Sequence, residues 1–147
     1  VGITGGSYGG YMSIMALLKA ADYVQVGVAQ SPGVDWRNYD TIYTERYMGL
    51  PMYNADGYEQ GNPLNYVKNL KGKLVIQHGA VDDNVHPTHV MQLVDALLKA
   101  GKEFEWYMYP GQAHGIGYRQ ARNQMLDTFM EHLSPETRDD YFADKNR

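Results

Sequence analysis

A serine set among glycines is the residue of this chain best suited to covalent chemistry. Gly5-Gly6-Ser7-Tyr8-Gly9 has the form G-x-S-x-G, with an apolar run before it and a helical pattern after it. This pattern predicts a sharp strand-to-helix turn, on which a serine hydroxyl protrudes far enough to reach a carbonyl carbon. We therefore predict that Ser7 is the nucleophile of an acyl transfer. The backbone N–H of Tyr8, at the helix start, is predicted to donate to the oxyanion.

A serine nucleophile needs a base, and the chain offers one in the expected order. Where this turn occurs, an Asp or Glu and then a His follow the serine, each on a loop after a strand. Asp82 follows an apolar run that ends at Ile76, and His114 follows a strand-like run that ends at Tyr109. His114 is predicted to accept the Ser7 proton, while Asp82 holds the imidazole tautomer and stabilises the imidazolium.

Several neighbouring residues leave alternatives open. Asp83 competes with Asp82, and spacing alone does not choose between them; an acidic pair before Asn84 is also typical of a solvated turn or a helix cap. His86 and His89 lie three apart, but two histidines without a nearby third ligand do not make a zinc site. We expect no metal and no cofactor.

Strand-like and helix-like patterns alternate along the chain, which predicts an α/β fold. The expected strands are Val1–Thr4, Val24–Ala29, Leu74–Ile76 and Phe104–Tyr109, with helices after Ser7, after Pro87 and around Ala121–Leu133. The region from Asp35 to Asn69 has no long periodic element and is rich in aromatic residues. We expect it to pass over the carboxyl edge of the sheet, where such folds bind ligands, with a short helix around Tyr39–Tyr47.

Bulk composition sets limits on what the chain can be. It has 147 residues, 44% of them apolar and 20% charged, which is typical of one globular domain. The net charge is −4 with scattered basic residues, so nucleic acid is not an expected partner. No stretch is apolar enough for a membrane span and there is no cysteine. Because the chain starts at Val1, inside a predicted strand, we interpret it as a piece of a longer protein. Residues 1–135 are expected to be a domain part and 136–147 a charged tail.

Longer motifs resemble one family of serine peptidases. They are Gly6-Ser7-Tyr8-Gly9-Gly10-Tyr11, His78-Gly79, Asp82-Asp83-Asn84-Val85, Trp36-Arg37-Asn38-Tyr39-Asp40 and Tyr43-Thr44-Glu45-Arg46-Tyr47-Met48-Gly49-Leu50-Pro51. Together they resemble the prolyl oligopeptidase family, and the last two resemble its dipeptidyl peptidase IV branch. The resemblance implies the C-terminal half of an α/β-hydrolase domain, with about four mostly parallel strands and flanking helices.

The resemblance also assigns roles to individual residues. It implies that Asp82 is the triad member and that Asn84 donates to a backbone carbonyl of the substrate. It implies a specificity pocket that takes proline and is lined by Tyr8, Trp36, Tyr39, Tyr43 and Val85. An aromatic box suits proline, whose compact apolar ring has no N–H. One position, Gly33, departs from the family pattern, which usually has a small apolar residue there.

Other expectations concern parts outside this sequence. The family implies an N-terminal hydrolase half whose tyrosine completes the oxyanion hole, and a β-propeller whose glutamates bind the substrate's amino terminus. Relatives are commonly periplasmic, secreted or membrane-anchored, and frequent dimers among them leave a homodimer open.

The leading hypothesis is a serine peptidase that releases X-Pro or X-Ala dipeptides through an acyl-enzyme. The alternatives are another α/β-hydrolase, such as an oligopeptidase, an acylaminoacyl peptidase or an esterase, and a non-catalytic module that binds partners on a hydrolase scaffold. We expect the isolated 147 residues to be inactive and prone to associate, because the Val1–Thr4 strand would be an unpaired edge.

Overall fold

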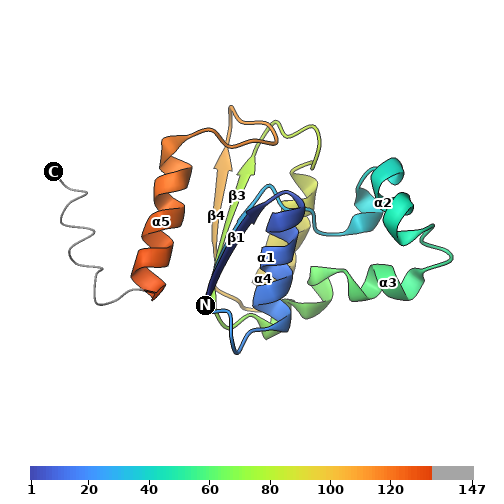
Figure 1. Cartoon of the computed structure of the whole chain (residues 1–147), viewed down its shortest axis with the longest axis horizontal. Helices are drawn as coiled ribbons and strands as arrows, with labels where there is room; N and C mark the ends of the chain where they lie inside the picture. The colour runs from blue at the N-terminus through green and yellow to red at the C-terminus, as the bar shows by residue number, and fades with distance from the viewer. Residues whose placement is uncertain (134–147) are drawn as a thin grey trace.

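The computed structural model describes residues 1–133 and contains one parallel sheet (Figure 1). Its strands are β1 Gly2–Gly6, β2 Val26–Gln30, β3 Lys73–Gly79 and β4 Glu105–Tyr109. They lie side by side in chain order, β1-β2-β3-β4, and every neighbouring pair is parallel. The predicted sheet of parallel strands is therefore confirmed, and all four carboxyl ends meet at one edge.

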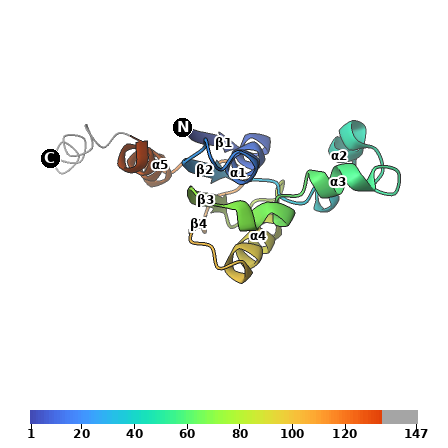
Figure 2. The ribbon, with the colours of Figure 1, turned by 90° about the horizontal axis from the view of Figure 1, so that it is seen from below.

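Three helices cover the two faces of this sheet. They are α1 Tyr8–Lys19, α4 Thr88–Lys99 and α5 Arg119–Leu133. Figures 1 and 2 show α1 and α4 on one side of the sheet and α5 on the other. Helices on both faces are what parallel strands require, because such strands must be buried on both sides.

The main core lies between the sheet and the two helices α1 and α4. Leu17, Leu74, Ile76, Leu93 and Leu97 are all fully buried there. On α4 the apolar residues recur at steps of three and four, which places them on one helix face.

The opposite face of the sheet is partly polar where α5 packs. Gln77 on β3 donates to the backbone carbonyl of Ala121 and to the Oε1 atom of Gln124, both on α5. Successive strand residues point to opposite faces, which explains why Gln77 faces α5 while Ile76 packs in the main core.

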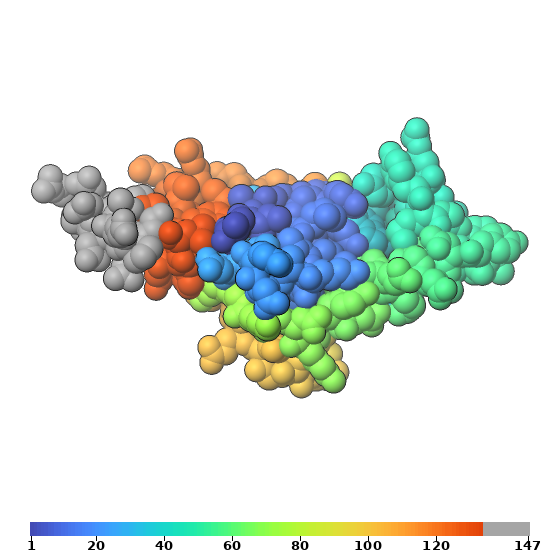
Figure 3. Space-filling model, turned by 60° about the horizontal axis from the view of Figure 1, so that its bottom comes forward, coloured from blue at the N-terminus to red at the C-terminus, as the bar shows by residue number. Residues whose placement is uncertain are grey.

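The region between β2 and β3 is a chain of short helices: η1 Trp36–Asn38, α2 Thr41–Met48, α3 Ala55–Gln60 and η2 Pro63–Asn69. The expected short helix is confirmed as α2, whereas α3 and η2 were not predicted. Figure 3 shows α2 and α3 extending from the body as an arm. Side-chain caps begin several of these pieces: Asp35 caps η1, Asp40 caps α2 and Asn62 caps η2.

The predicted charged tail, residues 136–147, lies outside the described residues. Within residues 1–133, no helix combines the length and the apolar character that a membrane crossing needs.

Candidate active site

Ser7 occupies a strained turn at the carboxyl end of β1. Its backbone has φ 56° and ψ −120°, a conformation that non-glycine residues rarely adopt and that often marks functional sites. The Ser7 N–H donates to the carbonyl of Gln30 at the end of β2, 2.9 Å away. Tyr8 follows as the first residue of α1, in the turn where N–H groups lack acceptors within the helix. The geometry thus has the form predicted for the turn, with the N–H of Tyr8 beside the hydroxyl-bearing residue.

Close packing around the turn explains two of its glycines. A Cβ on Gly5 would lie 2.6 Å from the backbone of Gly9, and a Cβ on Gly10 would lie 2.6 Å from the carbonyl oxygen of Gln30. By contrast, a Cβ on Gly9 would meet nothing within 4 Å. Close approach of the backbone therefore requires Gly5 and Gly10, whereas it does not require the second glycine of the G-x-S-x-G pattern.

The structure distinguishes between the two neighbouring aspartates. Asp82 is only 2% exposed, and its Oδ1 accepts the N–H groups of Asn84 at 3.0 Å and Val85 at 2.9 Å. Its Oδ2 lies 2.9 Å from Nδ1 of His114. Asp83 is exposed. Burial among donors stabilises a carboxylate in a fixed orientation, so Asp82 is the acid placed to orient an imidazole.

His114 is held both by its ring and by its backbone. Because Nδ1 carries the proton donated to Asp82, Nε2 is left as the acceptor, the tautomer that a general base needs. Its backbone carbonyl accepts a 2.9 Å hydrogen bond from the hydroxyl of Ser31. Ser31 is buried and has a left-handed backbone, φ 42°, and it directly follows Gln30, which binds the Ser7 N–H. The end of β2 thus connects the loops of Ser7 and His114.

A second histidine supports Asp82 from inside the fold. His78, fully buried at the end of β3, has its Nε2 2.9 Å from the carbonyl of Val85 and 3.3 Å from Oδ2 of Asp82. Burial lowers the pKa of His78, so the ring is neutral and acts there as an N–H donor. His78 therefore fixes the Asp82–Val85 turn without adding a charge.

Aromatic rings form a cavity beside Ser7. Its volume is about 70 Å³, and it is lined by Ser7, Tyr8, Gly33, Trp36, Tyr39, Tyr43 and Val85. Trp36 is buried and central, with ring centroids 5.6 Å from Tyr8 and 5.7 Å from Tyr39. The structure thus brings together the aromatic residues of the predicted pocket, and Val85 completes the wall.

The floor of the cavity explains the departure at Gly33. A Cβ at that position would lie 3.0 Å from the six-membered ring of Trp36. The indole therefore leaves little room there, and it would have to shift by a few tenths of an ångström to admit a side chain at residue 33.

A larger cavity of about 440 Å³ shares three of these rings. Tyr8, Trp36 and Tyr43 line both cavities, and Tyr11, Thr44, Tyr47 and Met48 complete the larger one. The Thr44 hydroxyl is buried and has no hydrogen-bond partner within residues 1–133.

Asn84 lies next to two residues that line the smaller cavity: it is bonded to Tyr39 and precedes Val85, and its amide is oriented. The hydroxyl of Tyr39 donates to Oδ1 of Asn84 over 2.5 Å, which leaves the Nδ2 donors of that amide for another partner. Burial raises the pKa of Tyr39, so its hydroxyl keeps its proton for this bond. This orientation is the one that a donor to a substrate carbonyl requires.

The other histidines do not form a site. His89 is buried, and its Nδ1 accepts the N–H of Val34 at 3.1 Å, while His86 is exposed. Among residues 1–133, no three histidine or carboxylate side chains gather in a way that could hold a metal ion.

Sequence reasoning missed Ser31 and His78 as supports of the site. His78 carried a signal, since it belongs to one of the motifs of the family resemblance and ends a strand at the same edge as the triad candidates. Ser31 carried none, because its bond to His114 joins residues that are distant in the sequence.

Comparisons with known proteins identify the family of the chain. Residues 1–138 match the family model described as the prolyl oligopeptidase family. Dipeptidyl peptidase 8 of Homo sapiens is 42% identical over 119 residues, which cover 79% of this chain and 13% of that protein. The crystal structure of Porphyromonas gingivalis dipeptidyl peptidase 4 superposes with a TM-score of 0.85 at 36% identity, covering 90% of this chain and 19% of that one. The chain therefore spans less than a fifth of the length of these relatives.

Proposed function

Because this chain belongs to the prolyl oligopeptidase family, we propose that it supplies the catalytic residues of a dipeptidyl serine peptidase. Ser7 attacks the scissile carbonyl and His114 takes its proton as general base. Asp82 holds the imidazole, and the N–H of Tyr8 stabilises the oxyanion of the tetrahedral intermediate. His114 gives this proton to the leaving amine as the C–N bond breaks, which forms the acyl-enzyme on Ser7. Water, deprotonated by the same imidazole, then hydrolyses the acyl-enzyme and frees Ser7.

The observation that carries this proposal is the bond between Asp82 and His114. Asp82 is buried among donors, binds Nδ1 of the imidazole, and lies on the same edge of the sheet as the strained Ser7. An exposed carboxylate would not hold the imidazole of His114 in one orientation, and a protonated Nε2 could not accept the Ser7 proton. A non-catalytic hydrolase scaffold has no need of such a bond.

The aromatic cavity supports specificity for proline next to the cleaved bond. Its volume of about 70 Å³ and its ring lining favour a compact apolar side chain over a charged or extended one. Asn84, oriented by Tyr39, is placed to bind a backbone carbonyl of the substrate. The same pocket accommodates alanine with fewer contacts.

The proposed partners are those that the family resemblance of the sequence implies. A peptide is the substrate, and the remainder of the hydrolase domain and a propeller domain supply the second oxyanion donor and the amino-terminus site. A homodimer of the whole protein is part of the same proposal.

The test is cleavage of a Gly-Pro anilide by the whole protein and by its Ser7→Ala variant. We expect the substitution to lower kcat by at least about 10³-fold, because the nucleophile is lost. A fluorophosphonate probe should label Ser7 in the unmodified protein, as located by peptide mapping. Undiminished cleavage by the variant would refute the proposal, and hydrolysis of the matched ester without the amide would indicate an esterase.

A further inference from the structure

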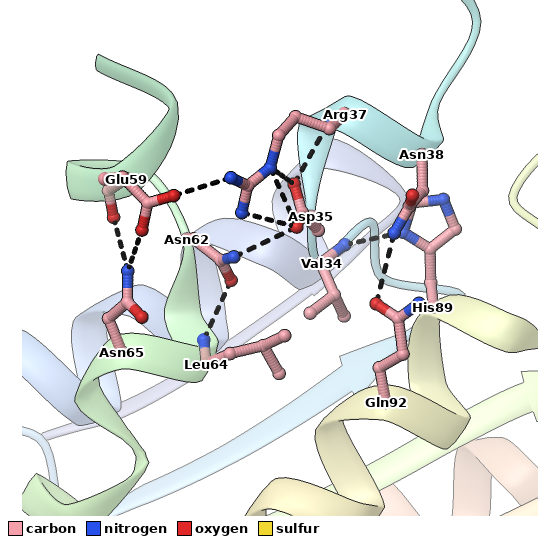
Figure 4. Close-up of polar contacts among 10 residues, drawn as sticks. All are labelled: Val34, Asp35, Arg37, Asn38, Glu59, Asn62, Leu64, Asn65, His89 and Gln92. Carbon is pink, nitrogen blue, oxygen red and sulfur yellow. Dashed lines mark hydrogen bonds and ion pairs between the residues drawn. The ribbon is translucent and has the colours of Figure 1, made fainter. Parts of the chain in front are cut away.

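We propose that an ionic cluster around the buried carboxylate of Asp35, next to the aromatic cavity, positions Trp36 and thereby sets the preference for proline. The Arg37 cluster consists of Asp35, Arg37, Glu59 and Asn62, and Figure 4 shows its bonds. Asp35 and Arg37 flank Trp36 in the chain, so they act on the cavity through the backbone of η1. This inference rests on the proposed function and identifies positioning residues for it.

Asp35 is the centre of the Arg37 cluster. It is only 8% exposed, and its carboxylate accepts the backbone N–H of Arg37 at 3.0 Å, which caps η1. The Arg37 guanidinium binds the same carboxylate through Nε and Nη2, at 2.9 Å and 2.8 Å. Asn62, itself buried, donates from Nδ2 to Oδ2. Bidentate binding fixes direction as well as distance, so this carboxylate locks the backbone on either side of Trp36.

The Arg37 cluster also ties η1 to a distant part of the chain. The remaining Arg37 nitrogen, Nη1, binds Oε1 of Glu59 on α3 at 2.5 Å. Asn62 caps η2 by accepting the N–H of Leu64 on its Oδ1. Bonds to the two carboxylates, that to Asp35 above all, raise the pKa of Arg37 above its usual value. The guanidinium therefore stays charged and keeps both partners.

A second set of bonds holds η1 from the side of α4 (Figure 4). The N–H of Val34 donates to Nδ1 of the buried His89, and Nδ2 of Asn38 donates to Oε1 of Gln92 at 3.1 Å. The segment 34–38 is thus held by α4 on one side and by α3 and η2 on the other. Loosening either side would let the Trp36 ring shift.

A small shift of the Trp36 ring matters because the cavity is small and the ring is closely packed against its neighbours. The Trp36 ring lies against Gly33, where no side chain fills space, and against Tyr8 and Tyr39. Apolar pockets discriminate between ligands that differ by one or two carbons only through close contact. A displaced ring therefore weakens proline binding more than alanine binding, which depends less on that contact.

The experiment compares the whole protein with its Asp35→Asn variant, using three measurements. The first is hydrogen exchange by mass spectrometry on peptides that span residues 31–40. The second is the ratio of kcat/KM for Gly-Pro and Gly-Ala anilides. The third is the labelling rate of Ser7 by a small fluorophosphonate that leaves the cavity empty. Asp95→Asn, which breaks an exposed pair with Lys99 on α4, makes the same chemical change away from the cavity and is the control.

We expect Asp35→Asn to speed exchange in residues 31–40 by about 10-fold or more, since the N–H groups there lose their acceptor or its support. The proline-to-alanine ratio should fall at least about fivefold, mainly through KM, because one or two carbons of contact are at stake. The labelling rate of Ser7 in Asp35→Asn should equal that of the unmodified protein. The control variant Asp95→Asn should equal the unmodified protein in all three measurements. If Asp35→Asn does not fold, Arg37→Gln keeps the Asp35 cap and is expected to act in the same direction.

Two results would overturn the inference. One is unchanged exchange in residues 31–40, which would show that the Arg37 cluster does not hold this segment. The other is faster exchange with an unchanged substrate ratio, which would reduce the cluster to a purely structural role. If the unmodified protein cleaves neither anilide, the proposed function fails, whereas the exchange data still decide whether the cluster positions η1.

Discussion

At the scale of single residues, the neighbours Asp82 and Asp83 show what a sequence can and cannot resolve. Both follow the same strand and have the same chemistry, so spacing does not separate them. The fold does, because one is buried against His114 and the other is exposed.

Asp82→Asn should lower kcat by about 10³- to 10⁴-fold, because an amide at this position favours the wrong imidazole tautomer. Asp83→Asn should leave kcat within about twofold, since surface substitutions away from buried bonds have small effects. Steady-state kinetics on one anilide decide between them. A larger loss from the Asp83 variant would reverse the assignment of the two carboxylates.

Ser31 is expected to matter for turnover although it touches no substrate group. Ser31→Ala removes the bond to the His114 carbonyl, worth about 1 kcal/mol, so kcat should fall roughly three- to tenfold with KM unchanged. Ser13→Ala, which removes a bond to Gly9 within α1, is the matched control. Equal kcat in the two variants would argue against a positioning role for Ser31.

The candidate triad could be predicted from the sequence because a short motif and a fixed order of residue types along the chain indicate it. Ser31 and the Arg37 cluster could not be read in this way. Their partners are distant in sequence, as with Asp35 and Asn62, and only the fold brings them together. The roles of the predicted site residues stay predictions until the variants are measured.

At the scale of elements, the turn between β1 and α1 leads to a contrast between adjacent glycines. Gly10→Ala should destabilise the fold by about 1–3 kcal/mol, because its Cβ would meet backbone that cannot move cheaply. Gly9→Ala should be neutral or stabilising by up to about 1 kcal/mol, since the space is open and alanine favours a helix. Thermal unfolding midpoints test both changes. Equal decreases of the unfolding midpoint in the two variants would show that the close contact at Gly10 does not explain the need for glycine there.

Regular elements were predictable where apolar residues are periodic. The strands and α1, α4 and α5 follow from such patterns, and their boundaries differ from expectation by a few residues. The helices α3 and η2 lack that signal because they are short and bury few residues. No side chain caps α3, Asn62 caps η2, and the Arg37 cluster binds Glu59 and Asn62.

At the scale of the whole molecule, buried histidines link stability to pH. Burial lowers the pKa of His89, and the unfolded chain titrates near the ordinary value of about 6.5. Below that value the unfolded state binds more protons than the folded one. The contribution of His89 is therefore complete above pH 6.5 and is lost as pH falls toward the folded pKa.

His89→Gln should make stability less dependent on pH, because the amide oxygen can accept the Val34 N–H and does not titrate. Urea unfolding midpoints at pH 7.5 and 5.5 measure the effect, with the exposed His86→Gln as control. An undiminished pH dependence in His89→Gln would exclude His89 as its source.

The surface of the described residues also has unpartnered regions. The outer side of β1 pairs with no strand among residues 1–133, and Ile42, Tyr47, Met52 and Tyr53 on the arm are highly exposed. Both features favour association when the chain is alone. The expected inactivity and self-association of the isolated 147 residues stay predictions.

The order of the strands in the sheet equals their order in the chain, and this has a consequence for biosynthesis. As β2, β3 and β4 leave the ribosome, each can pair with the strand that was made just before it. Ser7 is made first, Asp82 later and His114 last. A nascent chain therefore carries the serine before it carries the imidazole, and the proposed triad is complete only after β4 has been made.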